Sequence, residues 1–505
     1  MFRVVIIATL GLLISAAAYA ADRSAAAYEP FPSGYGYMDA NEITKLQAAW
    51  QDGSNKPGNQ AIIRDHGWRL WAGIMQQASG TNWPVWFTWP NSTAAFLPAA
   101  PAGLGAALAE GKPASSMLQR NMLNNTNPVH VPSPFYPIPE PVVKQYPNAA
   151  NNCAKHKDTK TYPNICDGSH FQFNGDILIV TESLSQEGFD WIRGNRLYLG
   201  AVLDSAHTAG EHQLSAPQQH VVTKHMFWPV KAGQVSALPV WRSNYFKEDY
   251  AGYAGYEKWP ELIAIDPTGQ NVGKTMQVSY LYGLDQPDET PPPGEKPPPP
   301  DKRKPWPTVT ASAKVFGLND FYYHRVTAED WASFDEADKA ILNAASYWTY
   351  NQPFGAGDYL VTVAMHINTK EIPTWTMQSV WWSDQPNAGQ YAQNRPQLPQ
   401  AKGPWDHYLL VDAYGSPEQK PPVSQPVATN PYIELASHPI ATNCNNCHNR
   451  AGWPKGTDPD QSSYQSSDCP DLLATLSTKS DCLKKLTLTD FQWIITDRAI
   501  VANPK

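Results

Sequence analysis

Apolar residues recur at helical intervals in two stretches near the start of the chain. Residues 41–50 and 61–77 show this spacing, and the second stretch includes Trp68 and Trp71. Further along, Thr327-Ala328-Glu329-Asp330 resembles a capping box and predicts a helix that continues through residues 341–348. An apolar face predicts a last helix over residues 489–500.

A different texture begins near residue 170, where short aromatic or β-branched runs predict strands. These runs cover residues 171–173, 176–180, 196–199, 220–230, 276–282, 359–368 and 375–382. Helices and strands are not arranged in a regular alternation, and we find no internal repeat. We therefore expect an α+β protein with a β-rich, sandwich-like core, flanking helices and a distinct C-terminal segment.

Proline marks the boundaries between regions. Residues 287–307 hold ten prolines, which predicts a stiff, solvated polyproline II segment. It is either a domain linker or a loop inserted between two strands of one domain, and strand-like runs on both sides favour the loop. We expect an N-terminal α+β region over residues 21–286, a β-rich region over 308–430 that packs with it, and a C-terminal segment over 431–505.

Composition narrows the function classes. The chain has 505 residues with a formal net charge of −8, an acidic balance that argues against a nucleic-acid partner. The first 20 residues combine Arg3, an apolar run and the sequence Ala18-Tyr19-Ala20, which together predict a cleavable secretory signal peptide. The apolar run is shorter than the roughly 20 residues that a membrane span needs. We therefore expect an exported protein whose mature chain has no membrane span.

Cys444-Asn445-Asn446-Cys447-His448 matches C-x-x-C-H, the attachment pattern of haem c. In this chemistry two thiols add to the haem vinyl groups, and the adjacent histidine binds the iron as proximal ligand. The pattern is stronger evidence for haem c when it follows an export signal, because covalent haem attachment takes place outside the cytoplasm. The alternatives are a redox dithiol or half of a zinc site, although zinc would require two further ligands at matching spacing.

The other four cysteines fall into two pairs with equal spacing. Cys153 and Cys166 are 13 positions apart, and so are Cys469 and Cys482. Disulfides form in oxidising compartments, so two local disulfides are the simplest interpretation for an exported protein. Other connectivities stay open, since sequence alone does not fix them.

Several aromatic motifs accompany the haem pattern. They are Trp68-Arg69-Leu70-Trp71, Trp83-Pro84-Val85-Trp86, Trp228-Pro229-Val230, Leu238-Pro239-Val240-Trp241, the run from His366 to Pro373, Trp381-Trp382 and Asp490-Phe491-Gln492-Trp493. With them the chain resembles the large single-haem "cytochrome c family" proteins that proteobacteria export. The resemblance covers most of the mature chain and implies a periplasmic protein with one covalent haem c. It implies no particular reaction.

The second axial position of the iron needs a ligand from upstream of the haem motif. No Met or His follows His448, and the last methionine is Met377. The alternatives are a rarer donor such as Lys or Tyr, or an open iron. Alternation along residues 359–366 places Val361, Val363 and Met365 on a core face, and His366 on a more polar face with Leu360, Thr362, Ala364 and Asn368.

We therefore expect His366 to be the distal ligand or to line the distal pocket, with an ordinary hydrogen-bonded histidine as the alternative. Lower-ranked candidates are His438, His407, His324 and His225. Lys370-Glu371 is either a redox-linked proton pair or a solvated surface ion pair. Four tryptophans could be core residues, electron relays or a surface on which a sugar stacks: Trp375, Trp381, Trp382 and Trp405. The core is favoured, because aromatic side chains are usually buried.

Two functions follow from this reading. The first is electron transfer through a six-coordinate haem to a periplasmic redox partner protein. The second is a haem-dependent oxidoreductase that acts on a small molecule at an open distal face. A single haem favours the first, and the length of the chain favours the second, because electron carriers are commonly much shorter.

Overall fold

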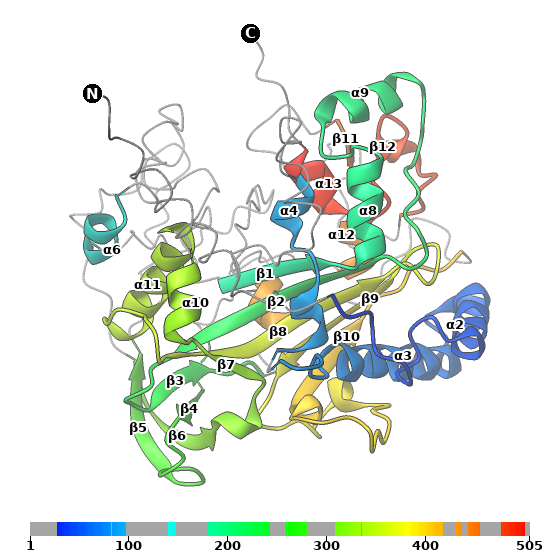
Figure 1. The fold of residues 1–505 in the computed structure, drawn as a ribbon. Helices are drawn as coiled ribbons and strands as arrows, with labels where there is room; N and C mark the ends of the chain where they lie inside the picture. The colour runs from blue at the N-terminus through cyan, green and yellow to red at the C-terminus, as the bar shows by residue number, and fades with distance from the viewer. Residues whose placement is uncertain are drawn as a thin grey trace, which may run out of the picture.

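A six-stranded antiparallel sheet forms the centre of the molecule (Figure 1). Across the sheet the strands run β1 (Ile179–Leu184), β2 (Val221–Val230), β8 (Tyr359–Thr369), β9 (Thr376–Trp382) and β10 (Tyr408–Asp412), with β7 (Tyr323–Arg325) paired to β8. This computed structural model describes residues 28–81, 83–96, 140–147, 179–242, 259, 261–280, 309–334, 336–417, 428, 430–435, 443–454 and 476–499. Strands from both sides of the proline-rich segment share this sheet, since β2 pairs with β8.

A four-stranded sheet lies beside the first. Its order is β3 (Ser236–Pro239), β4 (Leu262–Asp266), β6 (Val309–Gly317) and β5 (Thr275–Tyr280), and only β4 and β6 are parallel. β5 and β6 are antiparallel, with Tyr280 opposite Val309. The chain between them, which includes the proline-rich residues 287–307, therefore joins two paired strands of one sheet. Those proline-rich residues themselves lie outside the described part.

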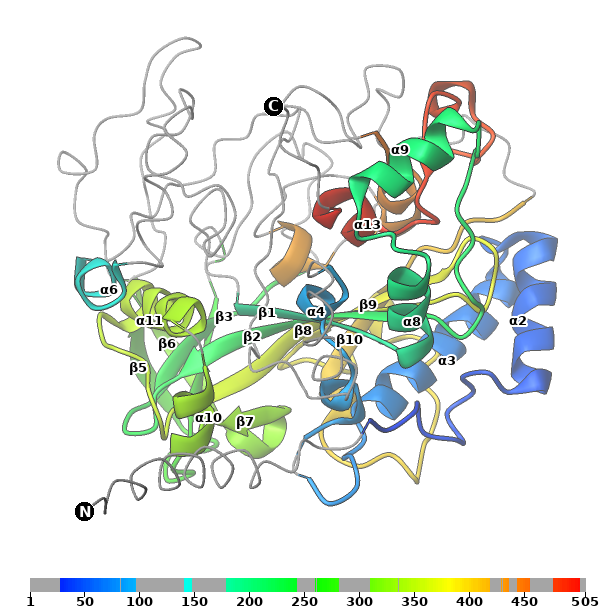
Figure 2. The ribbon, with the colours of Figure 1, turned by 45° about the horizontal axis from the view of Figure 1, so that its top comes forward.

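Helices and short elements surround the two sheets (Figures 1 and 2). The helices are α2 (Ala40–Gly53), α3 (Pro57–Ile74), α4 (Ser92–Phe96), α6 (Glu140–Gln145), α8 (Gln186–Gly194), α9 (Gly200–Thr208), α10 (Ala328–Ser333), α11 (Glu336–Tyr350), α12 (Cys444–His448) and α13 (Trp493–Arg498). Single helical turns are η1 (Val85–Thr88), η6 (Leu318–Asp320), η7 (Gln390–Ala392), η8 (Trp405–His407), η9 (Pro431–Leu435) and η11 (Asp481–Leu483). β11 (Gly452–Trp453) and β12 (Thr487–Leu488) form a small separate ribbon.

Different helices cover the two faces of the six-stranded sheet. α3 packs on one face, where Gly67 lies against the side chains of Leu410 and Gln378; a β-carbon at residue 67 would already touch Leu410. On the opposite face Glu182 of β1 accepts hydrogen bonds from Ser92 of α4 and Arg498 of α13, each at 3.0 Å. We call this second face the C-terminal face, because α12 and α13 lie on its side (Figure 1).

The pattern-based expectations are largely confirmed. The α+β class is confirmed, as are both N-terminal helices and the strands predicted over 220–230, 359–368 and 375–382. The strand predicted over 276–282 is confirmed as far as Tyr280, where the described residues end. The strand predicted over 171–173 lies outside the described residues, as does the one over 176–180 apart from its last two residues, which begin β1. The strand predicted over 196–199 is wrong, because Arg196 adopts a left-handed φ of 58° and the chain turns into α9. The helix that opens at Thr327 ends at Ser333, and α11 begins anew at Glu336. The last helix begins only at Trp493.

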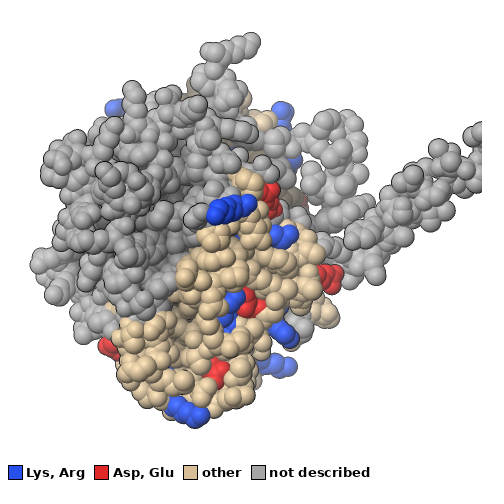
Figure 3. Space-filling model, turned by 90° about the vertical axis from the view of Figure 1, so that its left-hand side faces the viewer, with Lys and Arg blue, Asp and Glu red and all other residues tan. Residues whose placement is uncertain are grey.

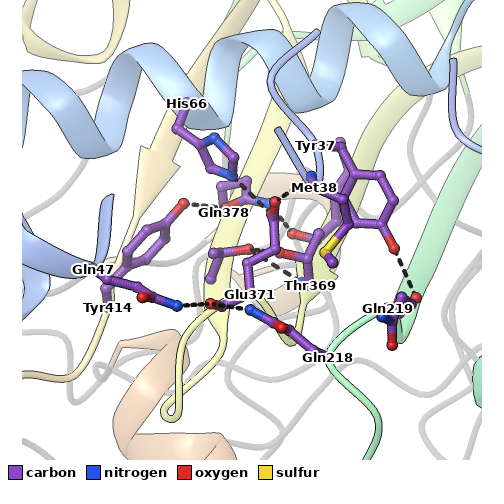
Figure 4. Close-up of polar contacts among 12 residues, drawn as sticks. Tyr37, Met38, Gln47, His66, Gln218, Gln219, Thr369, Glu371, Gln378 and Tyr414 are labelled. Atoms are coloured by element: carbon purple, nitrogen blue, oxygen red, sulfur yellow. Dashed lines mark hydrogen bonds and ion pairs between the residues drawn. The ribbon is translucent and has the colours of Figure 1, made fainter. Parts of the chain in front are cut away.

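A buried carboxylate ties the N-terminal helices to the sheet (Figure 4). Glu371, in the hairpin between β8 and β9, is 1% exposed and accepts hydrogen bonds from the Met38 amide (2.8 Å), the Thr369 hydroxyl (2.6 Å) and His66 Nε2 (2.9 Å). Burial would raise the pKa of Glu371, but His66 and these hydrogen bonds hold it below its ordinary value. Its backbone carbonyl accepts a further hydrogen bond from Gln47 of α2. One side chain thus joins the N-terminal segment, α3 and the hairpin.

The charged surface is mixed in sign. On the face shown in Figure 3, basic and acidic side chains are interspersed over the described part of the chain. Within the described residues, no helix is long and apolar enough to cross a lipid bilayer.

Candidate functional site

Cys444, Cys447 and His448 come together on the five-residue helix α12. Asn443 caps this helix by accepting a hydrogen bond from the Asn446 amide at 3.0 Å. The two intervening residues, Asn445 and Asn446, are buried, whereas both cysteines and the histidine are partly exposed. Residues three and four positions apart share one face of a helix, so both thiols and the imidazole project from the same, accessible side. Neither cysteine takes part in a disulfide.

A backbone carbonyl fixes the orientation of the His448 ring. His448 Nδ1 lies 2.7 Å from the carbonyl oxygen of Phe491. A carbonyl can only accept, so Nδ1 carries the proton and the lone pair of the neutral ring is on Nε2. An iron-binding histidine requires this tautomer. A backbone carbonyl that accepts a hydrogen bond from the other ring nitrogen is a usual outer-shell partner of such a ligand. The C-x-x-C-H residues therefore fit a covalently bound haem.

The loop before α13 presents this carbonyl in an unusual conformation. Asp490 and Phe491 both adopt left-handed φ angles, of 52° and 64°. Phenylalanine seldom occupies this region, so the surrounding structure must hold the turn in place. Trp493 at the start of α13 donates its indole N–H to the Cys447 carbonyl at 3.2 Å. The C-terminal residues therefore contact the haem motif at two points, Phe491 and Trp493.

His366 lies on the C-terminal face of the six-stranded sheet. It stands opposite Lys224 of β2 and Ser379 of β9, and Lys224 in turn stands opposite Glu182 of β1. Directly opposed residues share a face, and Glu182 bonds to α13. Ser379 points the same way, because its hydroxyl accepts a hydrogen bond from Asn430 just before η9. His366 therefore belongs to a polar row that faces the C-terminal segment.

This row keeps some exposure although it crosses interior strands. Lys224 and His366 are partly exposed, as is Asn368 two residues along β8, while Ser379 at the end of the row is buried. Their neighbours on the other face, such as Met365 and Ile367, are buried. Cys444 of α12 and Val222, which stands opposite Asn368, pack against the same apolar cluster, which includes Met377 and Phe491. The structure thus brings the haem motif to the end of the sheet face that carries His366.

A β-bulge corrects the predicted alternation of β8. Met226 pairs with Ala364 and Phe227 pairs with Thr362, so Val363 is skipped. Thr362 consequently lies on the opposite face from His366, where its hydroxyl contacts His225 Nε2 at 2.6 Å. Met365 is fully buried on that same opposite face, 3.2 Å from His225 Nδ1. Met365 is therefore a core residue, as the pattern predicted, and the placement of Thr362 beside His366 was wrong.

The other candidate histidines lie elsewhere or outside the described residues. His225 is fully buried on the α3 face and stacks on Trp86 at 4.4 Å. His324, on β7, pairs with Asp330 at 2.8 Å and stacks on Trp83. His407 ends η8 and precedes Tyr408 of β10, which pairs with Trp382. Trp382 is at the opposite end of β9 from Met377, the residue in the cluster with Cys444. His438 lies outside the described residues. His366 is the candidate that stands in the polar row of the C-terminal face.

Lys370 and Glu371 are neighbours in sequence but do not pair with each other. Glu371 contacts His66, whereas Lys370 Nζ lies 2.6 Å from Asp490 Oδ1. Both side chains are largely buried, so the surface-ion-pair interpretation is wrong. The two residues instead tie the same hairpin to opposite partners, Glu371 to α3 and Lys370 to the C-terminal segment. Trp375, Trp381, Trp382 and Trp405 are all buried.

A neutral histidine is buried between the sheet and the C-terminal segment. His220 is fully buried, and its Nδ1 lies 3.2 Å from Nε2 of Gln492. Its ring packs against Trp375 and over Gly188, where a β-carbon would clash with the imidazole. Burial, aided by the positive charge of Lys370, lowers the pKa of His220 to about 3. The ring is therefore uncharged in the folded protein at neutral pH.

We expect this histidine to make the fold acid-sensitive. Below pH 6.5 the unfolded chain binds a proton at His220, whereas the folded chain does not until about pH 3. As the pH is lowered from 6.5 to 3, this residue should therefore decrease the free energy of unfolding by about 1.4 kcal/mol per pH unit. Urea unfolding at several pH values should show a shallower slope for His220→Gln. The exposed His212 provides the control variant His212→Gln. Equal slopes in wild type and His220→Gln would contradict the prediction.

One of the four cysteines in the predicted disulfides lies in the described part of the chain. Cys482 is disulfide-bonded. Cys153, Cys166 and Cys469 lie outside the described residues, so both pairings stay predictions. Across the described part of the chain, no group of three or more His, Cys, Asp and Glu side chains could hold a metal ion by itself.

The sequence did not reveal the partners of His448. Asp490-Phe491-Gln492-Trp493 stood out as a motif, but its contact with His448 runs through a backbone carbonyl, which no side-chain pattern reveals. The Lys370–Asp490 pair spans 120 positions and joins two loops. One sequence feature could have indicated this pair: Asp490 is an acidic residue in an otherwise uncharged C-terminal motif.

Comparison with known proteins found no match for this chain. No family model, curated protein or solved structure matches the chain.

Proposed function

We propose that the chain is an exported c-type cytochrome with one covalently bound haem that transfers electrons in the periplasm. The observation that carries the proposal is the His448–Phe491 hydrogen bond on a helix that presents Cys444, Cys447 and His448 from one side. The thiols would hold the haem, and Nε2 of His448 would bind its iron. Bound there, the haem supplies a one-electron redox couple, and the protein sets its ligands and surroundings.

His366 is the proposed distal ligand. It comes from an interior strand, so its backbone is held on both sides by β2 and β9. A ligand on such a strand is fixed in position before it meets the iron, which suits electron transfer because little rearrangement accompanies the change in iron charge. The C-terminal segment over residues 431–505 would then be the haem segment, and the sheet would supply the distal side.

A second candidate function is a haem-dependent oxidoreductase with an open distal face. The observation that favours it is the polar row itself, since Lys224 and Ser379 flank His366 on strands of a large α+β body. Lys224, which is partly exposed, could orient a small polar substrate above the iron. In this case His366 would donate a hydrogen bond to the substrate rather than bind iron. A periplasmic redox partner protein is required in either case.

Haem attachment is the direct test. Purified from a host with cytochrome c maturation, the protein should give a pyridine haemochrome spectrum with one c-type haem per chain. Cys444→Ala combined with Cys447→Ala should remove all covalent haem, since both thioether bonds are then lost. The double variant Cys153→Ala and Cys166→Ala is the matched control and should keep its haem. A colourless wild type from such a host would refute the proposal.

A further inference from the structure

We propose that the buried Lys370–Asp490 ion pair positions the proximal ligand. In this view the pair holds the left-handed turn at Asp490 and Phe491, so that the Phe491 carbonyl stays aimed at Nδ1 of His448. Lys370 and Asp490 would then be positioning residues that act on the reduction potential through this carbonyl. The inference rests on the proposed function, because it concerns how this chain tunes a haem iron.

The contacts of Asp490 show how firmly the turn is held. Its side chain is fully buried and accepts hydrogen bonds from Lys370 Nζ (2.6 Å), the Ala216 amide (2.8 Å) and Gln213 Nε2 (3.2 Å). Lys370 also donates to the Pro373 carbonyl at 2.8 Å. The carboxylate thus draws its partners from the hairpin after β8 and from the chain before β2. Removal of one member would leave the other charge buried without its counter-ion.

Lys370 also contacts the carbonyl-bearing residue directly. Its ammonium lies 5.8 Å from the ring centre of Phe491 and 5.7 Å from that of Trp375. Both distances fall within the range of cation–π attraction. Lys370 therefore holds the turn twice, through the carboxylate of Asp490 and through the ring of Phe491.

The backbone at this turn needs such support. Two successive residues other than glycine in left-handed conformations are strained, and they persist only where the surroundings impose them. If the ion pair is lost, the turn can relax toward ordinary φ angles. Relaxation would move or rotate the Phe491 carbonyl, which lies 2.7 Å from His448 Nδ1. The hydrogen bond to the proximal ring would lengthen as a result.

The chemical consequence has a definite sign. A hydrogen bond from Nδ1 to an acceptor makes the imidazole a more basic ligand, which favours the more highly charged ferric iron. A weaker hydrogen bond should therefore raise the reduction potential of the one-electron couple. A purely coulombic role would behave differently, because removal of a positive charge lowers the potential and removal of a negative charge raises it.

This difference in sign defines the experiment. The midpoint potential of the haem-loaded protein is measured by spectroelectrochemistry for Lys370→Met, Asp490→Asn and the double variant, whose net charge equals that of wild type. We expect all three to rise, with the reduction equilibrium shifted about tenfold, equivalent to 59 mV for a one-electron couple. Hydrogen exchange of the amides from Leu488 to Trp493 should accelerate in parallel. Lys370→Arg, which keeps the pair, should stay near wild type.

Matched controls come from the Lys45–Glu42 pair on α2, whose side chains are 61% and 34% exposed. Lys45→Met and Glu42→Gln make the same charge changes far from any buried partner and should leave the potential in place. Potentials that shift in opposite directions for the two single variants and cancel in the double variant would overturn the inference. So would potentials unchanged from the controls in variants that retain haem. A wild type without covalent haem would refute the proposed function, and this inference with it.

Discussion

Glu371→Ala is expected to destabilise the protein by about 3–5 kcal/mol, because it leaves a buried set of donors without their acceptor. The carboxylate is fully buried and accepts from His66, Thr369 and the Met38 amide. The His66 ring and the Thr369 hydroxyl are buried, and the methyl group of alanine offers the His66 and Met38 donors no acceptor (Figure 4). Thr369 keeps a second partner, Thr376 Oγ1 at 2.6 Å. The loss should appear as a lower urea midpoint for global unfolding.

The control is a carboxylate of the same type at the surface. Glu42 pairs with Lys45 within α2, and the side chains are 34% and 61% exposed. Exposed pairs of this kind contribute about 0–1 kcal/mol, so Glu42→Ala should change little. A third variant, Glu371→Gln, keeps one acceptor oxygen and should fall between the two. If Glu371→Ala unfolds at the same urea concentration as Glu42→Ala, the network does not hold the N-terminal helices as described.

Periodicity in the sequence predicted the elements that position the site. The helix over residues 61–77 and the strand over 359–368 were readable because their buried sides repeat at fixed intervals, and the structure has α3 and β8 at these places. The C-x-x-C-H pattern was visible for another reason, since it is local and needs no tertiary context, and the structure places Cys444, Cys447 and His448 on one helix. That it holds haem stays a prediction. The alternation of β8 also identified Met365 as a core residue.

The same reasoning failed where the chain departs from regular geometry. The bulge at Val363 moves Thr362 to the other face of the sheet. No sequence pattern predicts it, because the residue at the bulge is of the same type as its neighbours in the strand. The late start of α13 has a similar origin. Apolar residues from 488 onward suggested one helix, but Asp490 and Phe491 take left-handed angles to meet the haem motif. Tertiary contacts override local preference at both places.

The adjacent residues Lys370 and Glu371 illustrate why charge pairs resist prediction. Neighbours in sequence, they look like one ion pair or a solvated patch. In the hairpin after β8 they point in opposite directions, and each meets a partner that lies at least 100 positions away. Their burial depends on which elements the fold brings to that hairpin. A sequence pattern holds no information on that until the topology is known.

His366→Ala is expected to convert a low-spin, six-coordinate haem spectrum to a high-spin one that shifts on addition of CO. The residue occupies the polar row on the C-terminal face, opposite Lys224 and Ser379. Alanine has no donor atom, so the iron would lose its sixth ligand. Covalent haem should remain, because Cys444 and Cys447 are untouched. Since β8 keeps its main-chain pairing with β2 and β9, the fold should survive.

The control for this prediction is His324→Ala, which removes a histidine from the edge strand β7, where it pairs with Asp330. Its spectrum should match wild type. If His366→Ala also matches wild type, His366 does not bind iron, and His438 becomes the residue to replace. A wild type that is already high-spin would give the result a different meaning. His366 would then stand above an open iron, His366→Ala should weaken cyanide binding, and the oxidoreductase proposal would replace electron transfer.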